Sequence, residues 1–340
     1  MTQTNGDRLR WGLLSTARIN RRLIPAIRSA GRAELFAVAS RDLQRAQVYA
    51  AEWDIPRAHC SYEALLDDPD VDVVYVPLPN ALHAEWTIRA TQAGKHVLCE
   101  KPLTTSVAEC TQIIAAAEAA GAVVMEAIMY LHHPLMHKVR QMVQEGTLGQ
   151  ITLARGSFSF FLDRPGDARW DPTLGGGSLW DLGIYPVSFI RWIAGEPEEV
   201  LGWQTLARQG VDETFVGLLR CADGVLGVFD CGFRQQFRNN AEVAGTEGTL
   251  IIERPYGPCP EKVIIRRGDT EQTFALPEVD AYRCEVEALT AAVLDGAALP
   301  VPLTNSRSNV ATLVALYQSA QTGVAQQIES AKASPAESRP

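Results

Sequence analysis

The sequence has no apolar run of about 18 residues, the length that a membrane-spanning helix needs, so we expect no span across a bilayer. Residues 1–8 are polar and lack the apolar centre of a signal peptide, which predicts a cytoplasmic protein. Basic residues are in deficit, because 31 Lys and Arg oppose 40 Asp and Glu and leave a formal net charge of -9. This balance argues against nucleic acid or an anionic membrane as a partner.

Disulfide and metal signals are also missing. The seven cysteines include no C-x-x-C pair, and their odd number favours reduced thiols over a disulfide framework. His133 and His137 are spaced like two ligands on one helix face, but no cysteine or carboxylate completes a set in the following turn. We therefore expect no metal and assign His132 and His133 a substrate-facing or structural role, with zinc as the minor alternative.

The sequence shows an α/β pattern. Its 340 residues are enough for two domains, and the hydrophobic content of 46% is enough to form their cores. From Leu9 to about Met129, short apolar runs alternate with segments whose apolar residues recur every three or four positions. The runs are Arg10–Ser15, Glu34–Ser40, Ala58–Cys60, Val73–Leu78, His96–Cys99 and Val123–Ile128; the helical segments are Ile19–Ala30, Leu43–Trp53, Ala81–Ala93 and Val107–Ala120. This alternation predicts a doubly wound parallel sheet over residues 1–130.

After residue 150 the apolar period changes to two. Strand-like segments separated by turn signals run from Gln150 to Leu276, which predicts a large, mostly antiparallel open sheet within residues 131–328. Helices are expected at Ser178–Ile193, Ala281–Leu294 and Asn305–Ile328. Residues 329–340 are polar and are predicted to be a disordered tail.

The first predicted strand is followed by Ser15-Thr-Ala17-Arg-Ile-Asn20, where a dinucleotide-binding chain usually carries G-x-G-x-x-G. True glycines are missing, but small side chains stand where a pyrophosphate must approach the backbone N–H groups of a helix N-terminus. We expect a dinucleotide site here; the alternative is a turn of small residues without a ligand. The residues expected to contact the cofactor at this turn are Ser15, Thr16, Ala17, Arg18 and Ile19.

The second predicted strand ends in Ser40-Arg41-Asp42. An enzyme that uses NAD usually places an acidic residue here for the ribose 2′-hydroxyl, whereas a nearby arginine accommodates the 2′-phosphate of NADP. Ser40 and Arg41 therefore favour NADP(H). In the alternative interpretation Ser40 or Asp42 only caps the next helix and Arg41 is solvated.

Lys101 ends an apolar strand, at the edge of a parallel sheet where ligands bind. Asp181 and Tyr185 are four residues apart, which places them on one face of the predicted helix. A lysine beside a tyrosine stabilises the phenolate and lowers a pKa that is ordinarily ~10. Lys101, Asp181 and Tyr185 therefore predict an acid/base site that oxidises an alcohol or reduces a ketone.

Further residues are expected to hold the cofactor near this site. Pro77, Leu78, Asn80 and His83 follow the preceding strand on the same edge, and the two prolines around Leu78 suit a rigid shelf for the nicotinamide. The triple glycine Gly175–Gly177 is interpreted as letting the cofactor lie against the backbone, beside Arg169 and Trp170.

Three motifs together resemble one oxidoreductase family. They are Glu100-Lys101-Pro102, the preceding P-x-P-N at Pro77–Asn80, and G-G-G-S-x-x-D-x-G-x-Y at Gly175–Tyr185. The chain resembles the glucose–fructose oxidoreductase, inositol dehydrogenase and rhizopine catabolism (Gfo/Idh/MocA) family over residues 9–328. Tyr185 and the Trp-Gly-Leu-Leu-Ser opening look most like the dihydrodiol dehydrogenase and NADP-dependent D-xylose dehydrogenase branch.

The resemblance implies a Rossmann domain, a C-terminal α/β domain with an open sheet, bound NADP(H) and a sugar or cyclic polyol substrate. It implies that Tyr185 is the acid/base, that Lys101 lowers its pKa and binds the reacting oxygen, and that Asp181 orients the substrate or Lys101. Glu100, from the same motif, joins the expected cofactor contacts, and His132 and His133 the substrate contacts. Two alternatives stay open: a keto-sugar reductase of deoxysugar biosynthesis, and a non-catalytic dinucleotide sensor.

Apolar residues on the outward face of the second predicted sheet indicate self-association. Depending on register, its outward residues include Val216, Leu218, Val225 and Val228. Uncovered, such a face would be a larger apolar patch than monomers usually tolerate. We therefore expect a homodimer or homotetramer formed through this face.

Overall fold

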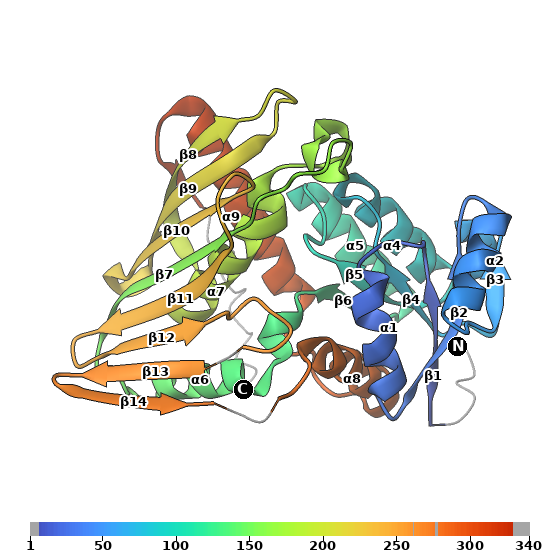
Figure 1. Ribbon diagram of the computed structural model, residues 1–340, viewed down its shortest axis with the longest axis horizontal. Helices are drawn as coiled ribbons and strands as arrows, with labels where there is room; N and C mark the ends of the chain where they lie inside the picture. The colour runs from blue at the N-terminus through green and yellow to red at the C-terminus, as the bar shows by residue number, and fades with distance from the viewer. Residues whose placement is uncertain (1–6, 261, 276–277, 329–340) are drawn as a thin grey trace, which may run out of the picture.

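The computed structural model describes residues 7–260, 262–275 and 278–328. These residues form two sheets that lie side by side, with helices packed around and between them (Figure 1). The predicted tail at 329–340 and the end of the strand prediction at Leu276 lie outside the described residues. Within the described ranges, no helix is both long and apolar enough to cross a membrane.

The first sheet has six parallel strands in the order β3-β2-β1-β4-β5-β6. This strand order is the doubly wound Rossmann arrangement, so the predicted fold of the first half is confirmed. The strands are β1 (Leu9–Leu13), β2 (Ala33–Ala39), β3 (Arg57–His59), β4 (Val73–Val76), β5 (His96–Glu100) and β6 (Val124–Ala127), and the helices are α1 (Asn20–Ser29), α2 (Leu43–Glu52), α3 (Tyr62–Leu66), α4 (His83–Gln92) and α5 (Val107–Ala120). The sequence prediction lacks α3, because five residues are too few to establish a helical period.

One helix from late in the chain belongs by packing to the first sheet. Helix α8 (Ala281–Asp295) lies against α1, and its Val286 and Leu289 are fully buried in the same core as Trp11. The predicted domain boundary near residue 130 assigns α8 to the second domain, whereas α8 packs in the core of the first sheet. Below, the first layer means the first sheet with its helices, including α8, and the second layer means the second sheet with its helices.

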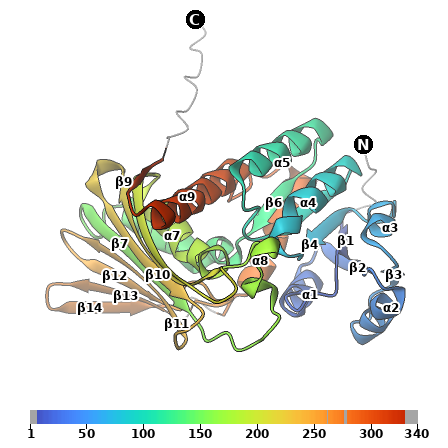
Figure 2. The same ribbon diagram turned by 90° about the horizontal axis from the view of Figure 1, so that it is seen from above.

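The second sheet has nine strands in the order β14-β13-β12-β11-β7-β10-β9-β8-β15, of which only the β7–β10 pair is parallel. Helices α7 (Ile184–Ala194) and α9 (Leu303–Thr322) pack against one face of this sheet (Figure 2). The predicted mostly antiparallel sheet is thus confirmed. Its strands are β7 (Ile151–Ser159), β8 (Pro197–Leu206), β9 (Asp212–Cys221), β10 (Leu226–Gly232), β11 (Arg238–Gly245), β12 (Thr249–Glu253), β13 (Lys262–Arg267), β14 (Thr270–Phe274) and β15 (Gln326–Gln327).

Two helix predictions need correction. Helix α9 ends at Thr322 rather than continuing to Ile328, because Gly323 takes a left-handed φ of 72° and caps it. Helix α6 (Pro134–Gln144) was not foreseen, although proline at its first position is a helix-start signal.

The face of the second sheet that points away from α7 and α9 carries apolar side chains. Val216 and Leu218 are 40% and 41% exposed there, as predicted. The prediction for Val225 is wrong, because this side chain is only 8% exposed. Val225 and Val228 are three residues apart, so alternation along a strand places them on opposite faces. Leu226 takes the outward position instead and is 52% exposed.

Candidate active site

A cavity of about 910 Å³ lies between the two layers and contains the predicted reaction centre. It is lined by Ala17, Arg18, Ile19, Pro77, Leu78, Asn80, Glu100, Lys101, Arg169, Asp181 and Tyr185 from the sequence prediction. The lining also includes residues that sequence reasoning missed, among them Arg21, Arg22, Phe158, Phe160, Arg164 and Tyr282. Arg21 and Arg22 come from α1 and Phe158 from β7, whereas Phe160 and Arg164 lie in the loop after β7 and Tyr282 in α8. The sequence motifs did not identify these residues, because tertiary packing brings them to the cavity.

Lys101 and Asp181 meet across this cavity. Lys101 follows the last residue of β5, and its Nζ donates to the Asp181 backbone oxygen at 2.7 Å and to Oδ1 at 2.8 Å. Asp181 lies in a π-helical turn, Leu179–Gly183, that leads into α7. A side chain of the first layer is therefore tied to the backbone and the carboxylate of the second.

Asp181 is also held from its other side. The Arg169 Nε donates to Asp181 Oδ2 at 2.5 Å, and Arg169 pairs in addition with Asp167 at 3.2 Å. Burial alone raises the pKa of Asp181, but the charges of Arg169 and Lys101 outweigh it and hold that pKa well below the ordinary range. Asp181 is therefore a carboxylate at any physiological pH.

Tyr185, at the start of α7, lies with its ring 5.2 Å from Lys101 Nζ, and its hydroxyl is 4.0 Å from the Met129 sulfur. The expectation that Lys101 lowers the pKa of Tyr185 is wrong for this arrangement. Burial raises that pKa well above its usual value, and nearby acidic groups act in the same direction. Lys101 cannot reverse the shift, because Asp181 engages its charge. Tyr185 is therefore a neutral phenol, able to donate a proton.

The triple glycine serves packing of the protein against itself. A Cβ on Gly176 would meet the Arg169 backbone oxygen at 2.5 Å, and one on Gly177 would meet Asp212 Oδ1 at 2.2 Å. Gly177 also has a φ of +128°, which a residue with a side chain rarely adopts. Gly175–Gly177 also line the cavity, so close backbone packing on one side leaves the predicted contact with the cofactor on the other side as a prediction.

Asp212, at the start of β9, anchors the turn that carries Asp181. Its Oδ2 accepts hydrogen bonds from Ser178 Oγ at 2.6 Å and from the Leu179 N–H at 2.7 Å, and its Oδ1 accepts one from the Tyr317 hydroxyl at 2.6 Å. Asp212 is 1% exposed and is not among the residues that line the cavity. Asp212 therefore positions the site without contacting the cavity, and no sequence motif predicts this role because its partners come from two distant segments.

The turn after β1 explains how this chain dispenses with the usual glycines. Asn20 occupies the third glycine position, and its Nδ2 donates to the Ser15 backbone oxygen at 2.7 Å, which braces the turn. The first turn of α1 has no acidic residue, while Arg21 and Arg22 line the cavity beside it. These features fit an anionic pyrophosphate at a helix N-terminus.

The residues after β2 are compatible with both interpretations of Ser40-Arg41-Asp42, a 2′-phosphate site and a helix cap. Asp42 caps α2 by accepting from the Arg45 N–H, and buried Ser40 accepts from the Asp42 N–H. Arg41 is exposed, and Arg45 donates from Nε to Thr16 Oγ1 at 2.8 Å. Arg45 is a second guanidinium at this corner that the strand-end motif did not reveal.

Several predicted site residues do not line the cavity: Ser15, Thr16, Ser40, Arg41, His83, His132, His133 and Trp170. His83 is fully buried, and both ring nitrogens contact backbone oxygens, of Pro102 and Leu78, at 2.7 Å. His133 caps α6 through Nδ1 and contacts the Val279 oxygen through Nε2. His83 and His133 therefore hold the backbone, which for His133 is the structural alternative and for His83 differs from the expected cofactor contact. Buried His132 has no hydrogen-bond partner for either ring nitrogen among the described residues. Trp170 packs edge-on against Phe233.

A Rossmann sheet whose strand ends meet a lysine, a carboxylate and a tyrosine defines a dinucleotide-dependent oxidoreductase. The comparisons with known proteins agree. Residues 9–128 match the family model described as an oxidoreductase family with an NAD-binding Rossmann fold, and residues 136–251 match the GFO/IDH/MocA C-terminal domain. The chain belongs to the Gfo/Idh/MocA oxidoreductase family, which confirms the resemblance found in its motifs.

Similar proteins cover nearly the whole chain. It is 39% identical over 325 residues to a D-xylose 1-dehydrogenase (NADP(+)) of Haloferax volcanii, covering 94% of this chain and 99% of the relative. It is 37% identical over 255 residues to the trans-1,2-dihydrobenzene-1,2-diol dehydrogenase of Mus musculus, covering 74% and 76%. A 3-ketoreductase from Actinomadura kijaniata, solved with NADP and TDP-benzene, has a TM-score of 0.87 at 34% identity and covers 92% and 98%.

Removing the anchor behind Asp181 should slow the reaction. We expect Asp212→Ala to lower kcat by about tenfold to a hundredfold, because a misplacement of roughly 1 Å can cost a factor near 10². Asp212→Asn keeps an acceptor oxygen and should stay close to the unmodified protein. Glu213→Ala, the next residue along and paired with Arg234, is the matched control in steady-state assays. An unchanged kcat in Asp212→Ala would contradict the anchoring role.

Proposed function

We propose that this protein binds NADP(H) and transfers hydride between the nicotinamide and a carbon that carries a hydroxyl or carbonyl group in a sugar or cyclic polyol. The observation that carries the proposal is the Lys101–Asp181 pair beside Tyr185, at the carboxyl ends of a Rossmann sheet. The named relatives, a xylose dehydrogenase and dihydrodiol dehydrogenases, act on such substrates. A sensor without catalysis would not need these three groups together.

The residues at the cofactor end fit NADP. Arg21 and Arg22 and the α1 N-terminus offer positive potential for the pyrophosphate. Arg41 and Arg45 lie near Tyr62, where their charges counteract part of the rise that burial causes in its pKa. Two guanidiniums at the end of β2, with Ser40 in place of an acidic residue, suit a 2′-phosphate.

In the mechanism that we infer, the bound nicotinamide donates or accepts the hydride. Lys101 keeps one N–H beyond its two contacts to Asp181 and directs it at the reacting oxygen. In reduction, the neutral Tyr185 donates its proton to that oxygen while the Lys101 ammonium stabilises the developing negative charge. In oxidation, the phenol first has to lose its proton to solvent, and the resulting phenolate then receives the proton of the substrate hydroxyl. Asp181 and Arg169 fix Lys101, so that its position is set before substrate binds.

The cavity walls support a polyol. Phe158 and Phe160 line one side, and Phe158 also packs edge-on against Tyr185 at 5.3 Å. Aromatic side chains that share the lining with Asn80, Lys101 and charged groups suit a ring with one C–H face and several hydroxyls, because an apolar ligand would leave those polar groups unsatisfied at about 1–3 kcal/mol each.

A keto-sugar reductase is the second candidate, favoured by the likeness to the A. kijaniata 3-ketoreductase. Initial rates with NADP(H) on aldoses, trans-dihydrodiols, nucleotide-linked keto-sugars and cyclohexanol separate the candidates. We expect D-xylose or a related pyranose to have a higher kcat/KM than cyclohexanol. Faster turnover of the plain alcohol than of every sugar would contradict a polyol substrate.

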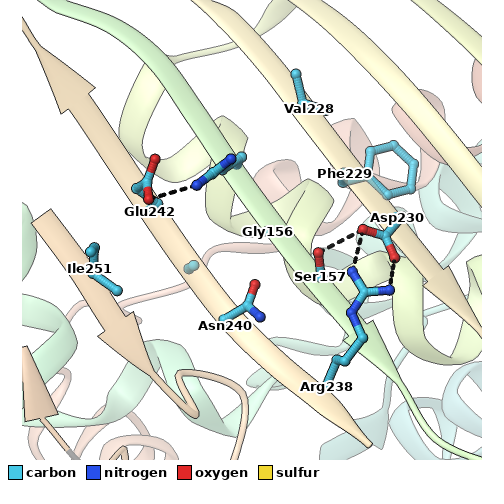
Figure 3. A pocket seen from close by; sticks show the side chains of 11 residues that line it. Gly156, Ser157, Val228, Phe229, Asp230, Arg238, Asn240, Glu242 and Ile251 are labelled. Carbon is cyan, nitrogen blue, oxygen red and sulfur yellow. Dashed lines mark hydrogen bonds and ion pairs between the residues drawn. The ribbon is translucent and has the colours of Figure 1, made fainter. Parts of the chain in front are cut away.

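The outer face of the second sheet supports a homodimer or a homotetramer. Trp203 pairs across the strands with Val216, and Leu218 with the half-buried Val228, so apolar side chains form a band over β8, β9 and β10. Beside the band, a hollow of about 510 Å³ is lined by the ion-paired Asp230 and Arg238, as Figure 3 shows. A second copy would cover the band and bring complementary polar groups to the hollow.

Charge in the apolar band should dissociate the assembly. Val216→Glu is expected to convert the unmodified dimer or tetramer to monomer at micromolar concentration, measured by light scattering. Val48→Glu, which places the same charge on a valine of α2 that is 63% exposed, against 40% for Val216, is the control and should leave the mass unchanged. A monomeric unmodified protein would refute the proposal.

The cofactor preference should depend on Arg41. A charge-assisted hydrogen bond to phosphate is worth about 1.5–3 kcal/mol, so we expect NADP to bind roughly tenfold to a hundredfold more tightly than NAD. Arg41→Ala should remove most of this difference, and Arg208→Ala, another exposed arginine, should keep it. Titration calorimetry gives both affinities. Equal affinities in the unmodified protein would contradict the assignment.

Lys101→Met and Tyr185→Phe should each keep cofactor binding but lower kcat by about 10²–10⁴-fold. The double variant should be little worse than either single variant, because the two groups act as a unit. Since burial keeps the Tyr185 phenol protonated, reduction should be independent of pH between about pH 6 and about pH 9. Tyr130→Phe is the control, because the Tyr130 hydroxyl contacts Ser188 Oγ and the Tyr185 backbone oxygen and Tyr130 does not line the cavity. A Tyr185→Phe protein with nearly full activity would mean that another group carries the proton.

A further inference from the structure

Glutamates from three elements lie beside the Lys101 end of the cavity: Glu100 is half-buried, whereas Glu126 and Glu285 are buried. Glu100 ends β5 and accepts hydrogen bonds from the Tyr75 hydroxyl and from the Lys101 N–H. Glu126, in β6, accepts from the Leu103 N–H at 2.8 Å. Glu285, in α8, is 0% exposed, and neither of its carboxyl oxygens has a hydrogen-bond partner among the described residues. An ionised carboxylate in such a position would be left without compensation.

The groups that surround Glu285 do not supply that compensation. Its burial raises its pKa well above the ordinary value, and the carboxyl groups of Glu100, Glu126 and Asp280 raise it further. Three tyrosines also interact with it, namely Tyr75 of β4, Tyr185 of α7 and Tyr282 of α8 itself. Buried His132 lies in the 3-10 turn Met129–His132, which packs against α8. Burial lowers the pKa of His132 to about 4, so this ring is neutral and adds no positive charge. Burial and the neighbouring carboxyl groups therefore disfavour the ionised form of Glu285 in the free protein.

Glu285 is electrostatically linked to the place where the nicotinamide has to lie. Hydride must reach the carbon whose oxygen Lys101 holds, so the nicotinamide ring belongs next to Lys101. Glu100 precedes Lys101 in the chain, and Tyr282 lies one helical turn before Glu285; both line the cavity. In this water-poor interior a charge on the ring acts on Glu285 far more strongly than it would in solvent.

We propose that Glu285 discriminates between the two redox states of the cofactor by releasing its proton to solvent when the positively charged oxidised nicotinamide binds, and by keeping it when the neutral reduced ring binds. The step converts the carboxylic acid to a carboxylate and one hydrated proton, with no electron transfer. The new carboxylate and the ring cation then compensate each other. The inference rests on the proposed binding of NADP(H).

The number of protons released on binding tests the proposal directly. Calorimetric titrations in two buffers of different ionisation enthalpy should show about one proton more released with NADP⁺ than with NADPH. The 2′-phosphate is common to both cofactors, so its own titration cancels in the difference. Because binding releases a proton, the affinity for NADP⁺ relative to NADPH should rise with pH, by up to about tenfold per unit.

The variant Glu285→Gln keeps the shape but cannot titrate, and it should abolish the difference in proton release while still binding NADPH. Glu287→Gln is the matched control, because Glu287 lies two residues further along α8 in an exposed pair with Arg283. Equal proton release for the two cofactors in the unmodified protein, or a difference that survives in Glu285→Gln, would overturn the inference. Failure to bind either cofactor would instead contradict the proposed function, and the unmodified protein alone decides between these outcomes if the variant does not fold.

Discussion

The ion pair between Lys101 and Asp181 is the interaction on which the site depends. It joins the end of β5 in the first sheet to the π-helical turn before α7, and it contacts both the carboxylate and the backbone oxygen of Asp181. Removing one partner of a buried pair leaves an uncompensated charge, which typically costs about 3–5 kcal/mol. The pair therefore fixes how the two layers meet, and the cavity between them inherits its geometry from this contact.

Several contacts within the second layer fix the position of Asp181. Asp212 accepts two hydrogen bonds from the turn and a third from Tyr317 of α9, and Gly176 and Gly177 let the backbone pack closely enough for these bonds to form. Arg169 completes the arrangement from the cavity side. Preorganisation of this kind costs folding free energy once, so that no reorganisation is needed when charge develops on the substrate oxygen.

Charge is unevenly distributed around the reacting position. Toward the second layer, Asp181 is ionised and balanced by two cations, whereas behind Lys101 the side chains of Glu100, Glu126 and Glu285 all have raised pKa values because burial disfavours their charged forms. The charged form of a carboxyl group is thus stabilised on one side of Lys101 and destabilised on the other. Only the local partners differ.

Much of this could be predicted from the sequence, because the signals are local. Apolar periods of two and of three to four determine the two sheets, and the motifs around Lys101, Asp181 and Tyr185 identify the family and the residues that meet in the cavity. What the tertiary structure decided depends on distant packing. It engages the charge of Lys101 with Asp181 and buries Tyr185, so that the tyrosine pKa rises where the sequence predicted a fall. It also directs His133 to the backbone and returns α8 to the first sheet with Glu285, since burial and partners arise only when remote segments meet.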